Sequence, residues 1–160
     1  MPGEVMRRVV TVEVDGRSKI ALNEEVSAGS YYQEIWAHDD VDQLGSDPGT
    51  EPHATVPAPG QTRFRMVSVP PHSEVQAEVA EIVARGEDVR LVMETDEEGW
   101  HRTETLDYVY VLDGPVELLV DDESVVIEPG DTVVQRSTNH AWRNHGDEPI
   151  RLLVFMAALR

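Results

Sequence analysis

HRTETLD, residues 101–107, and GDTVVQRSTNHAWRN, residues 130–144, are the two segments that place potential metal ligands among short apolar runs. If both segments form strands, side chains two residues apart point to the same face. Each segment then gives one inward set: His101, Thr103, Thr105 and Asp107 from the first, and His140, Trp142 and Asn144 from the second. The pattern predicts that two histidines and one carboxylate meet inside a small barrel.

The surrounding sequence is typical of an all-β protein. Short apolar stretches bounded by Gly, Pro and Asp predict strands at 6–14, 18–22, 31–37, 62–69, 106–112, 115–120, 124–128, 131–135, 139–144 and 150–157. Strands of this length and spacing favour a barrel or sandwich. One short helix is predicted between Pro70 and Gly86, and residues 38–61 are rich enough in turn formers to be a long surface loop and a candidate lid.

These residues resemble the two motifs of the cupin superfamily. His101, Thr103, Asp107 and Gly114 stand at the positions of the first motif, with threonine in place of its second histidine. Gly130, His140 and Asn144 match the second motif, in which Arg136 and Thr138 replace the usual proline and glycine. The chain thus resembles a divergent, small, single-domain bacterial cupin. The resemblance implies a cupin barrel, also called a double-stranded β-helix or jelly roll.

Length sets the expected domain organisation. At 160 residues the chain is predicted to be a single domain over residues 1–160. Its barrel core is expected at about residues 88–157. Residues 1–61 would be an N-terminal strand extension and a loop, and the helix would be inserted between barrel strands.

The expected metal site consists of His101, Asp107 and His140. Two imidazoles and one carboxylate suit Fe²⁺ or Zn²⁺, with Mn²⁺ or Ni²⁺ as alternatives, and leave coordination positions open. The chain has no cysteine, so a metal must bind to nitrogen and oxygen. The alternative is a barrel that has kept the fold and lost the metal.

Other side chains are candidates for the surrounding pocket. Thr103 and Gln135 are expected to orient a substrate or a bound water and are the candidate catalytic residues. The candidate substrate-pocket residues are Trp142, Asn144, Arg63 and Arg65. Core packing is an equal alternative for Trp142, and a surface position is the alternative for each arginine. An inward arginine would suit a carboxylate or enolate.

Charge and hydropathy limit the expected partners. Acidic residues outnumber basic ones by 31 to 13, which disfavours binding to nucleic acid phosphates. No apolar run has the length of a membrane span and no signal peptide is visible, so we expect a cytoplasmic protein that contacts no membrane. A homodimer is expected, because the resemblance implies pairing through sheet edges and N-terminal strands.

The sequence favours a metal-dependent enzyme that acts on a small organic molecule inside the barrel. Lyase, dehydratase or isomerase chemistry by proton transfer is the first hypothesis. A non-heme iron(II) dioxygenase, an oxidoreductase, could use the same ligands. The third hypothesis is a non-catalytic cupin that binds a small ligand, because one fold hosts many functions.

Overall fold

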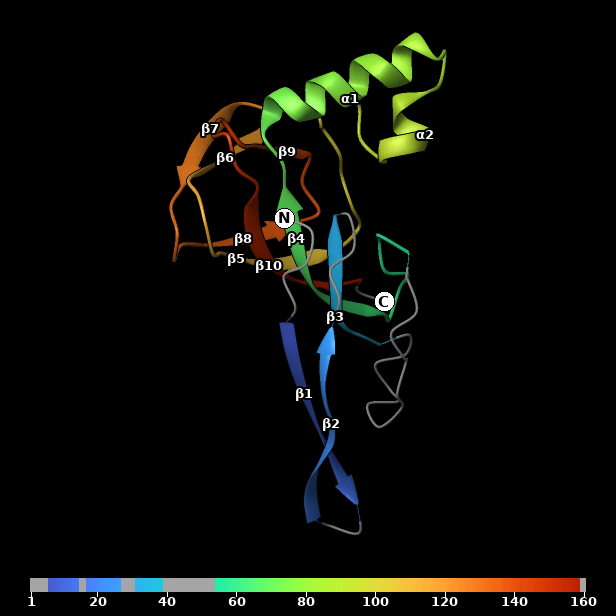
Figure 1. Ribbon diagram of the computed structural model, residues 1–160, viewed down its shortest axis with the longest axis vertical. Helices are drawn as coiled ribbons and strands as arrows, with labels where there is room; N and C mark the ends of the chain where they lie inside the picture. The colour runs from blue at the N-terminus through green and yellow to red at the C-terminus, as the bar shows by residue number, and fades with distance from the viewer. Residues whose placement is uncertain (1–5, 15–16, 27–30, 39–53, 159–160) are drawn as a thin grey trace.

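The computed structural model describes residues 6–14, 17–26, 31–38 and 54–158 (Figure 1). Its elements are β1 (Met6–Val14), β2 (Arg17–Val26), β3 (Tyr32–His38), β4 (Thr62–Val69), α1 (His72–Ala84), α2 (Val89–Met93), β5 (Leu106–Val111), β6 (Val116–Val120), β7 (Glu123–Ile127), β8 (Thr132–Arg136), β9 (His140–Arg143) and β10 (Ile150–Ala157). Most of the predicted loop, residues 39–53, lies outside the described residues.

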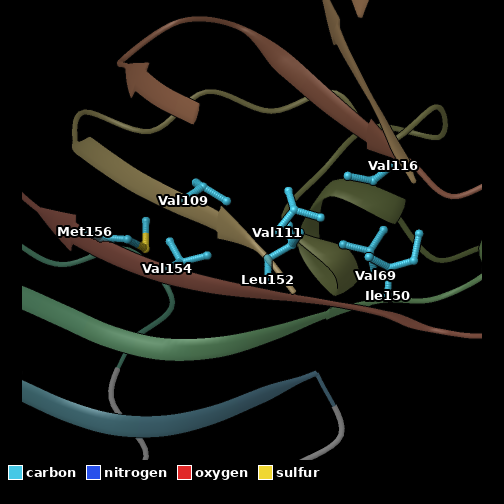
Figure 2. Packing of buried hydrophobic residues seen from close by; sticks show 8 residues of the cluster. All are labelled: Val69, Val109, Val111, Val116, Ile150, Leu152, Val154 and Met156. Carbon is cyan, nitrogen blue, oxygen red and sulfur yellow. The ribbon is translucent and has the colours of Figure 1, made fainter. Parts of the chain in front are cut away.

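Two antiparallel sheets form the barrel. The larger sheet has the order β3-β4-β10-β5-β8, and the smaller has the order β7-β6-β9. Apolar side chains from both sheets meet in one core cluster, which Figure 2 shows: Val69, Val109, Val111, Val116, Ile150, Leu152, Val154 and Met156. The predicted all-β barrel is therefore confirmed.

Strand β10 shows why the sequence forms this core. Its residues alternate between buried and half-buried positions over Ile150–Ala157. It pairs with β4 on one side and with β5 on the other, so it lies at the centre of the larger sheet. A central strand with this alternation directs one row of apolar side chains into the barrel.

The insertion between β4 and β5 contains two helices instead of the single predicted one (Figure 1). Val79 and Ile82 of α1 pack against Val89 of α2 in a cluster of their own. The additional helix begins where the Asp88 side chain accepts a hydrogen bond from the backbone N–H of Arg90 at 2.9 Å. That is an N-cap signal, which the sequence already carried. Neither helix is long and apolar enough to cross a bilayer.

The N-terminal part divides into two regions. Strand β3 lies within the predicted extension, yet it pairs with β4 and forms the edge of the larger sheet. By contrast, β1 and β2 pair only with each other in a separate two-stranded sheet. Figure 1 shows this dark blue hairpin pointing away from the barrel. The barrel wall therefore begins at β3, well before residue 88.

Candidate functional site

A cavity of about 220 Å³ opens in the barrel between the two sheets. Its lining combines an apolar wall with a group of polar side chains. The lining residues are Tyr32, Thr55, Val56, Arg65, Val67, Met93, Glu94, Thr95, His101, Arg102, Thr103, Asp107, Val109, Gln135, His140, Trp142, Leu152, Val154 and Met156. At roughly 30 Å³ per water, this volume holds about seven waters, which limits a ligand to a small molecule.

A larger depression of about 710 Å³ lies on the surface around α2 and the segment 96–98. Its lining includes Glu87, Asp88, Asp96, Glu97 and Glu98, most of which are exposed to solvent. It contains no histidine. Because buried polar groups converge only in the barrel cavity among the described residues that line either space, we take the barrel cavity as the candidate site.

His101 and His140 come together through a pair of backbone hydrogen bonds. Each residue donates its N–H to the other's carbonyl at 3.0 Å, which forms an isolated antiparallel bridge. Their ring centroids lie 4.3 Å apart, with the planes tilted by 56°. Residues 101–105 lie outside β5, which begins at Leu106, so 101–107 do not form one continuous strand. The bridge, and not a shared strand face, brings the first histidine to the second.

Both imidazoles are held by their Nδ1 atoms. Nδ1 of His140 lies 2.9 Å from the carbonyl oxygen of Thr138, and Nδ1 of His101 lies 3.1 Å from that of Gly99. A carbonyl oxygen can only accept, so Nδ1 is the donor in each of these contacts, and in a neutral ring the lone pair is then on Nε2. Burial, with a smaller effect of the nearby His101, lowers the pKa of His140 to about 4, so the His140 ring is neutral at pH 7.

Asp107 is buried beside this pair. Its Oδ1 atom has no hydrogen-bond partner among the described residues. Burial raises the pKa of Asp107, while a hydrogen bond from Thr105 and the neighbouring His101 act in the opposite direction. Thr103 Oγ1 lies 2.7 Å from Thr105 Oγ1, so Thr103 continues the same polar chain. A buried carboxylate oxygen without a partner is costly and indicates a ligand or ion that would satisfy it.

The donor chemistry of these residues suits a divalent metal, but their placement does not yet form a complete site. Two Nε2 lone pairs and one carboxylate oxygen are ligands that Zn²⁺ or Fe²⁺ would accept. Within the described ranges, however, no three side chains of the His, Cys, Asp and Glu types converge as a metal-binding group. The two imidazoles lie close together with their planes tilted, and Asp107 does not complete a three-ligand group with them.

Gln135 and Trp142 lie where the sequence analysis expected them, on the cavity wall. The Gln135 amide is buried and donates a hydrogen bond to Thr138 Oγ1. The Trp142 ring meets the His140 ring edge to face, with centroids 6.4 Å apart. The Gln135 hydrogen bond holds the loop that precedes His140, and the Trp142 ring covers one side of the His140 imidazole.

Arg65 lines the cavity, whereas Arg63 does not. Arg63 is buried, but its guanidinium donates to the carbonyl oxygens of Ala54 and Thr62 and to Gln61 Oε1. Two of those acceptors lie in the chain segment that precedes β4, and the third is on the first residue of β4. The expected pocket position of Arg63 is therefore corrected to a structural one.

Asn144 also lies outside the cavity. Its amide donates to the carbonyl oxygens of Val69 at 3.0 Å and Glu148 at 2.8 Å, and its Oδ1 accepts from Gly146 N–H at 2.8 Å. Strand β9 ends at Arg143, so the alternation that would place Asn144 beside His140 and Trp142 stops one residue too early. Asn144 connects chain segments and does not form the pocket floor.

Several cavity residues were missed by the sequence analysis. Tyr32 on β3 and Met93, Glu94 and Thr95 at the end of α2 all line the cavity. The alternation of β10 could have identified Leu152, Val154 and Met156 as inward residues. No local signal could have placed the α2 segment there, because its position depends on the helical insertion.

Comparison with known proteins agrees with this architecture. Residues 88–156 match the family model described as "Cupin domain". "Phomopsin biosynthesis cluster protein C'" of Diaporthe leptostromiformis is 47% identical over 57 residues, which are 35% of this chain and 30% of that protein. "Oryzines biosynthesis cluster protein J" of Aspergillus oryzae (strain ATCC 42149 / RIB 40) is 50% identical over 46 residues, or 28% and 26% of the two chains. The chain spans less than a third of these relatives.

One solved structure is similar to part of the chain. It is the Cupin_2 domain of an XRE family transcriptional regulator from Enterobacter cloacae, with 16% sequence identity and a TM-score of 0.39. The similarity covers 62% of this chain and 83% of that domain.

Proposed function

We propose that this chain, whose residues 88–156 match the family model described as "Cupin domain", is a metal-dependent cupin enzyme for a small organic molecule bound in the barrel cavity. His101, Asp107 and His140 would hold one divalent metal, with Fe²⁺ or Zn²⁺ as the first candidates. A bound metal supplies Lewis acidity toward a carbonyl or hydroxyl oxygen. The reaction class that suits this site is proton transfer in a lyase or isomerase.

The unpartnered Oδ1 of Asp107 is the observation that carries this proposal. It lies in a cavity that also receives two histidines with free Nε2 lone pairs. A buried carboxylate oxygen without a protein partner, beside two imidazoles on the wall of the same small cavity, is costly unless a ligand or cation satisfies it.

The remaining polar side chains suit the handling of a substrate. Thr103 and Gln135 carry hydroxyl and amide groups on the cavity wall and would orient a substrate or a water. Trp142 would exclude bulk water from the His140 side. A neutral His140 keeps its Nε2 lone pair for a metal at pH 7, since its pKa of about 4 leaves the ring unprotonated.

Elemental analysis of protein purified without chelator tests the metal. We expect about one divalent ion per chain, with His101→Ala and His140→Ala each reducing occupancy at least tenfold, because loss of a metal ligand removes a large part of the binding free energy. His72→Ala and His145→Ala are the matched controls. Neither of these histidines lines the cavity, and His145 instead pairs with Glu117 at 2.7 Å.

Equal metal content in wild type, both cavity variants and both controls would contradict the metal site. Dioxygen uptake by the iron-loaded protein would move the assignment from proton transfer to the dioxygenase.

A non-catalytic ligand-binding cupin is the second candidate. The observation that favours it is the absence of a converging three-ligand group among the described residues. This candidate predicts no bound metal, together with ligand binding that His101→Ala weakens only through the lost contact. The same elemental analysis, combined with a binding titration, separates it from the enzyme.

A further inference from the structure

Arg65 is the one cationic side chain among the described residues that is both fully buried and part of the cavity wall. Its guanidinium makes three hydrogen bonds. Nε and Nη2 donate to the Glu34 carboxylate, with the shorter distance at 2.5 Å, and Nη1 donates to the carbonyl oxygen of Thr55 at 2.9 Å. A guanidinium has five N–H donors, so two remain for a further acceptor.

The ion pair has a defined orientation. Arg65 lines the cavity and Glu34 does not, so the carboxylate stands behind the guanidinium and the positive end of the pair faces the ligand space. The Tyr32 ring holds this arrangement, because the Arg65 Cζ atom lies 4.9 Å from its centroid. A planar guanidinium fixed on two sides is suited to bidentate contact with a planar anion.

The distance between Arg65 and Asp107 limits the length of a ligand that can contact both ends of the cavity. In the larger sheet, Arg65 of β4 is opposite Val154 of β10, which is opposite Val109 of β5. Asp107 lies two residues farther along β5. Strand spacing and rise therefore separate the backbones of Arg65 and Asp107 by roughly 12 Å. One end of the cavity is cationic and lies at Arg65. The other end holds His101, His140 and Asp107, and the apolar row of β10 lies between the two ends.

Two carboxylates in the wall would oppose an anion. Asp107 belongs to the opposite end of the cavity. Glu94 lies nearer and contributes to raising the pKa of Tyr32, but its side chain is exposed to solvent. Screening weakens an exposed charge far more than a buried one. At its end of the cavity, the buried Arg65 therefore presents the positive side of its ion pair with Glu34 to a ligand.

We propose that Arg65, oriented by Glu34 and Tyr32, is the specificity-determining residue of the cavity and selects small carboxylic acids. The carboxylate of the ligand lies against the guanidinium, and its apolar chain extends along β10 so that its other end reaches the two histidines. This inference rests on the proposed function only in taking the cavity as the ligand site, and it requires no metal.

Calorimetric titration of metal-free, chelator-treated protein tests the proposal with three probes of nearly equal size: hexanoate, hexanamide and hexylammonium. We expect hexanoate to bind about 10- to 100-fold more tightly than hexanamide, and hexylammonium to bind least tightly, because a charge-assisted bidentate contact exceeds a neutral one by that factor. The chelator removes carboxylate binding to a metal as an alternative cause.

The double variant Arg65→Met with Glu34→Gln removes the cation and leaves no unpaired buried charge, so it protects the fold. We expect it to bind hexanoate and hexanamide equally. Arg63→Met is the matched control, since it also removes a buried arginine from β4 but outside the cavity. It should keep the preference for hexanoate.

The possible failures are distinguishable. Equal affinity of wild type for hexanoate and hexanamide, or tighter binding of hexylammonium, would overturn the role of Arg65 while leaving the cavity as the ligand site. A preference for hexanoate in a protein that never binds metal would refute the metal-dependent enzyme and support the Arg65 site. Failure to bind any of the three probes would overturn both the role of Arg65 and the assignment of the cavity as the ligand site.

Discussion

His140 shows how burial sets the protonation state of a single side chain. Its ring is almost fully buried, its Nδ1 is held by the Thr138 carbonyl, and its pKa is lowered to about 4. The folded protein therefore resists taking up a proton that the unfolded chain accepts near pH 6.5. A neutral imidazole in the cavity at pH 7 is the condition for both metal ligation and acceptance of a proton.

This difference predicts acid sensitivity in the metal-free protein. The contribution of His140 to stability is fully present above pH 6.5 and is lost as the pH falls from 6.5 toward 4, by about 3 kcal/mol in total. Asp107 acts in the opposite direction, because its raised pKa lets the folded state bind a proton first. Urea unfolding at pH 7 and pH 4.5, with chelator present, should show a smaller acid loss in His140→Asn than in wild type. His145→Asn, at an exposed position, is the control; an unchanged acid loss in His140→Asn would contradict this account.

At the scale of elements, Asn144 connects the ends of three of them. Its amide bonds the last residue of β4 and the turn before β10, and its backbone carbonyl accepts from His72 N–H at the start of α1 at 2.8 Å. Helix α1 has no side-chain cap, and Pro71 is the residue that precedes it. The bridge between Pro71 and Asn144 therefore positions the first turn of the helix.

Asn144→Ala should consequently destabilise the fold without changing the cavity. Loss of three side-chain hydrogen bonds at a buried position predicts a decrease of about 2–4 kcal/mol in the free energy of unfolding. Asn139→Ala is the matched control, because its single bond to Asp121 is exposed and should contribute less than about 1 kcal/mol. Equal losses in the two variants, measured by urea unfolding, would show that Asn144 does not connect these elements.

At the scale of the whole molecule, the outer face of the larger sheet is unusually apolar for so acidic a chain. Tyr108, Tyr110 and Val134 are exposed on adjacent strands β5 and β8. Phe155 of β10 stacks on Tyr108 with ring centroids 6.3 Å apart. With a net charge of −18 on each chain, self-association is favoured only where charge is absent. Exposed apolar patches of this kind mark interaction sites.

We therefore expect a homodimer that buries this face. Light scattering at micromolar concentration should give twice the mass of one chain, and Val134→Glu should shift the protein to monomer, because a buried unpaired carboxylate opposes association. Val125→Glu is the control, since Val125 is similarly exposed but lies on β7 of the other sheet. A monomeric wild type, or dissociation by Val125→Glu alone, would place the interface elsewhere or remove it.

The sequence by itself determined the strands, the charge and the types of ligand. Residues 6–14, 62–69 and 150–157 alternate strongly enough that the structure begins and ends these strands where the pattern predicts. Such patterns are local, because the period of two is a property of each strand alone. The same holds for the types of metal ligand, because residue identity alone fixes which atoms the histidines and the carboxylate can offer.

Only the tertiary structure decided which of these residues share a site. Arg63 and Arg65 are two residues apart on β4, so periodicity places both side chains on the same face and cannot distinguish them. Arg63 nevertheless donates to backbone carbonyls, whereas Arg65 lies on the cavity wall and pairs with Glu34, 31 positions upstream. His101 reaches His140 through a bridge outside any strand. Contacts between residues distant in sequence depend on how the sheets close and where a strand ends, and no local pattern encodes either.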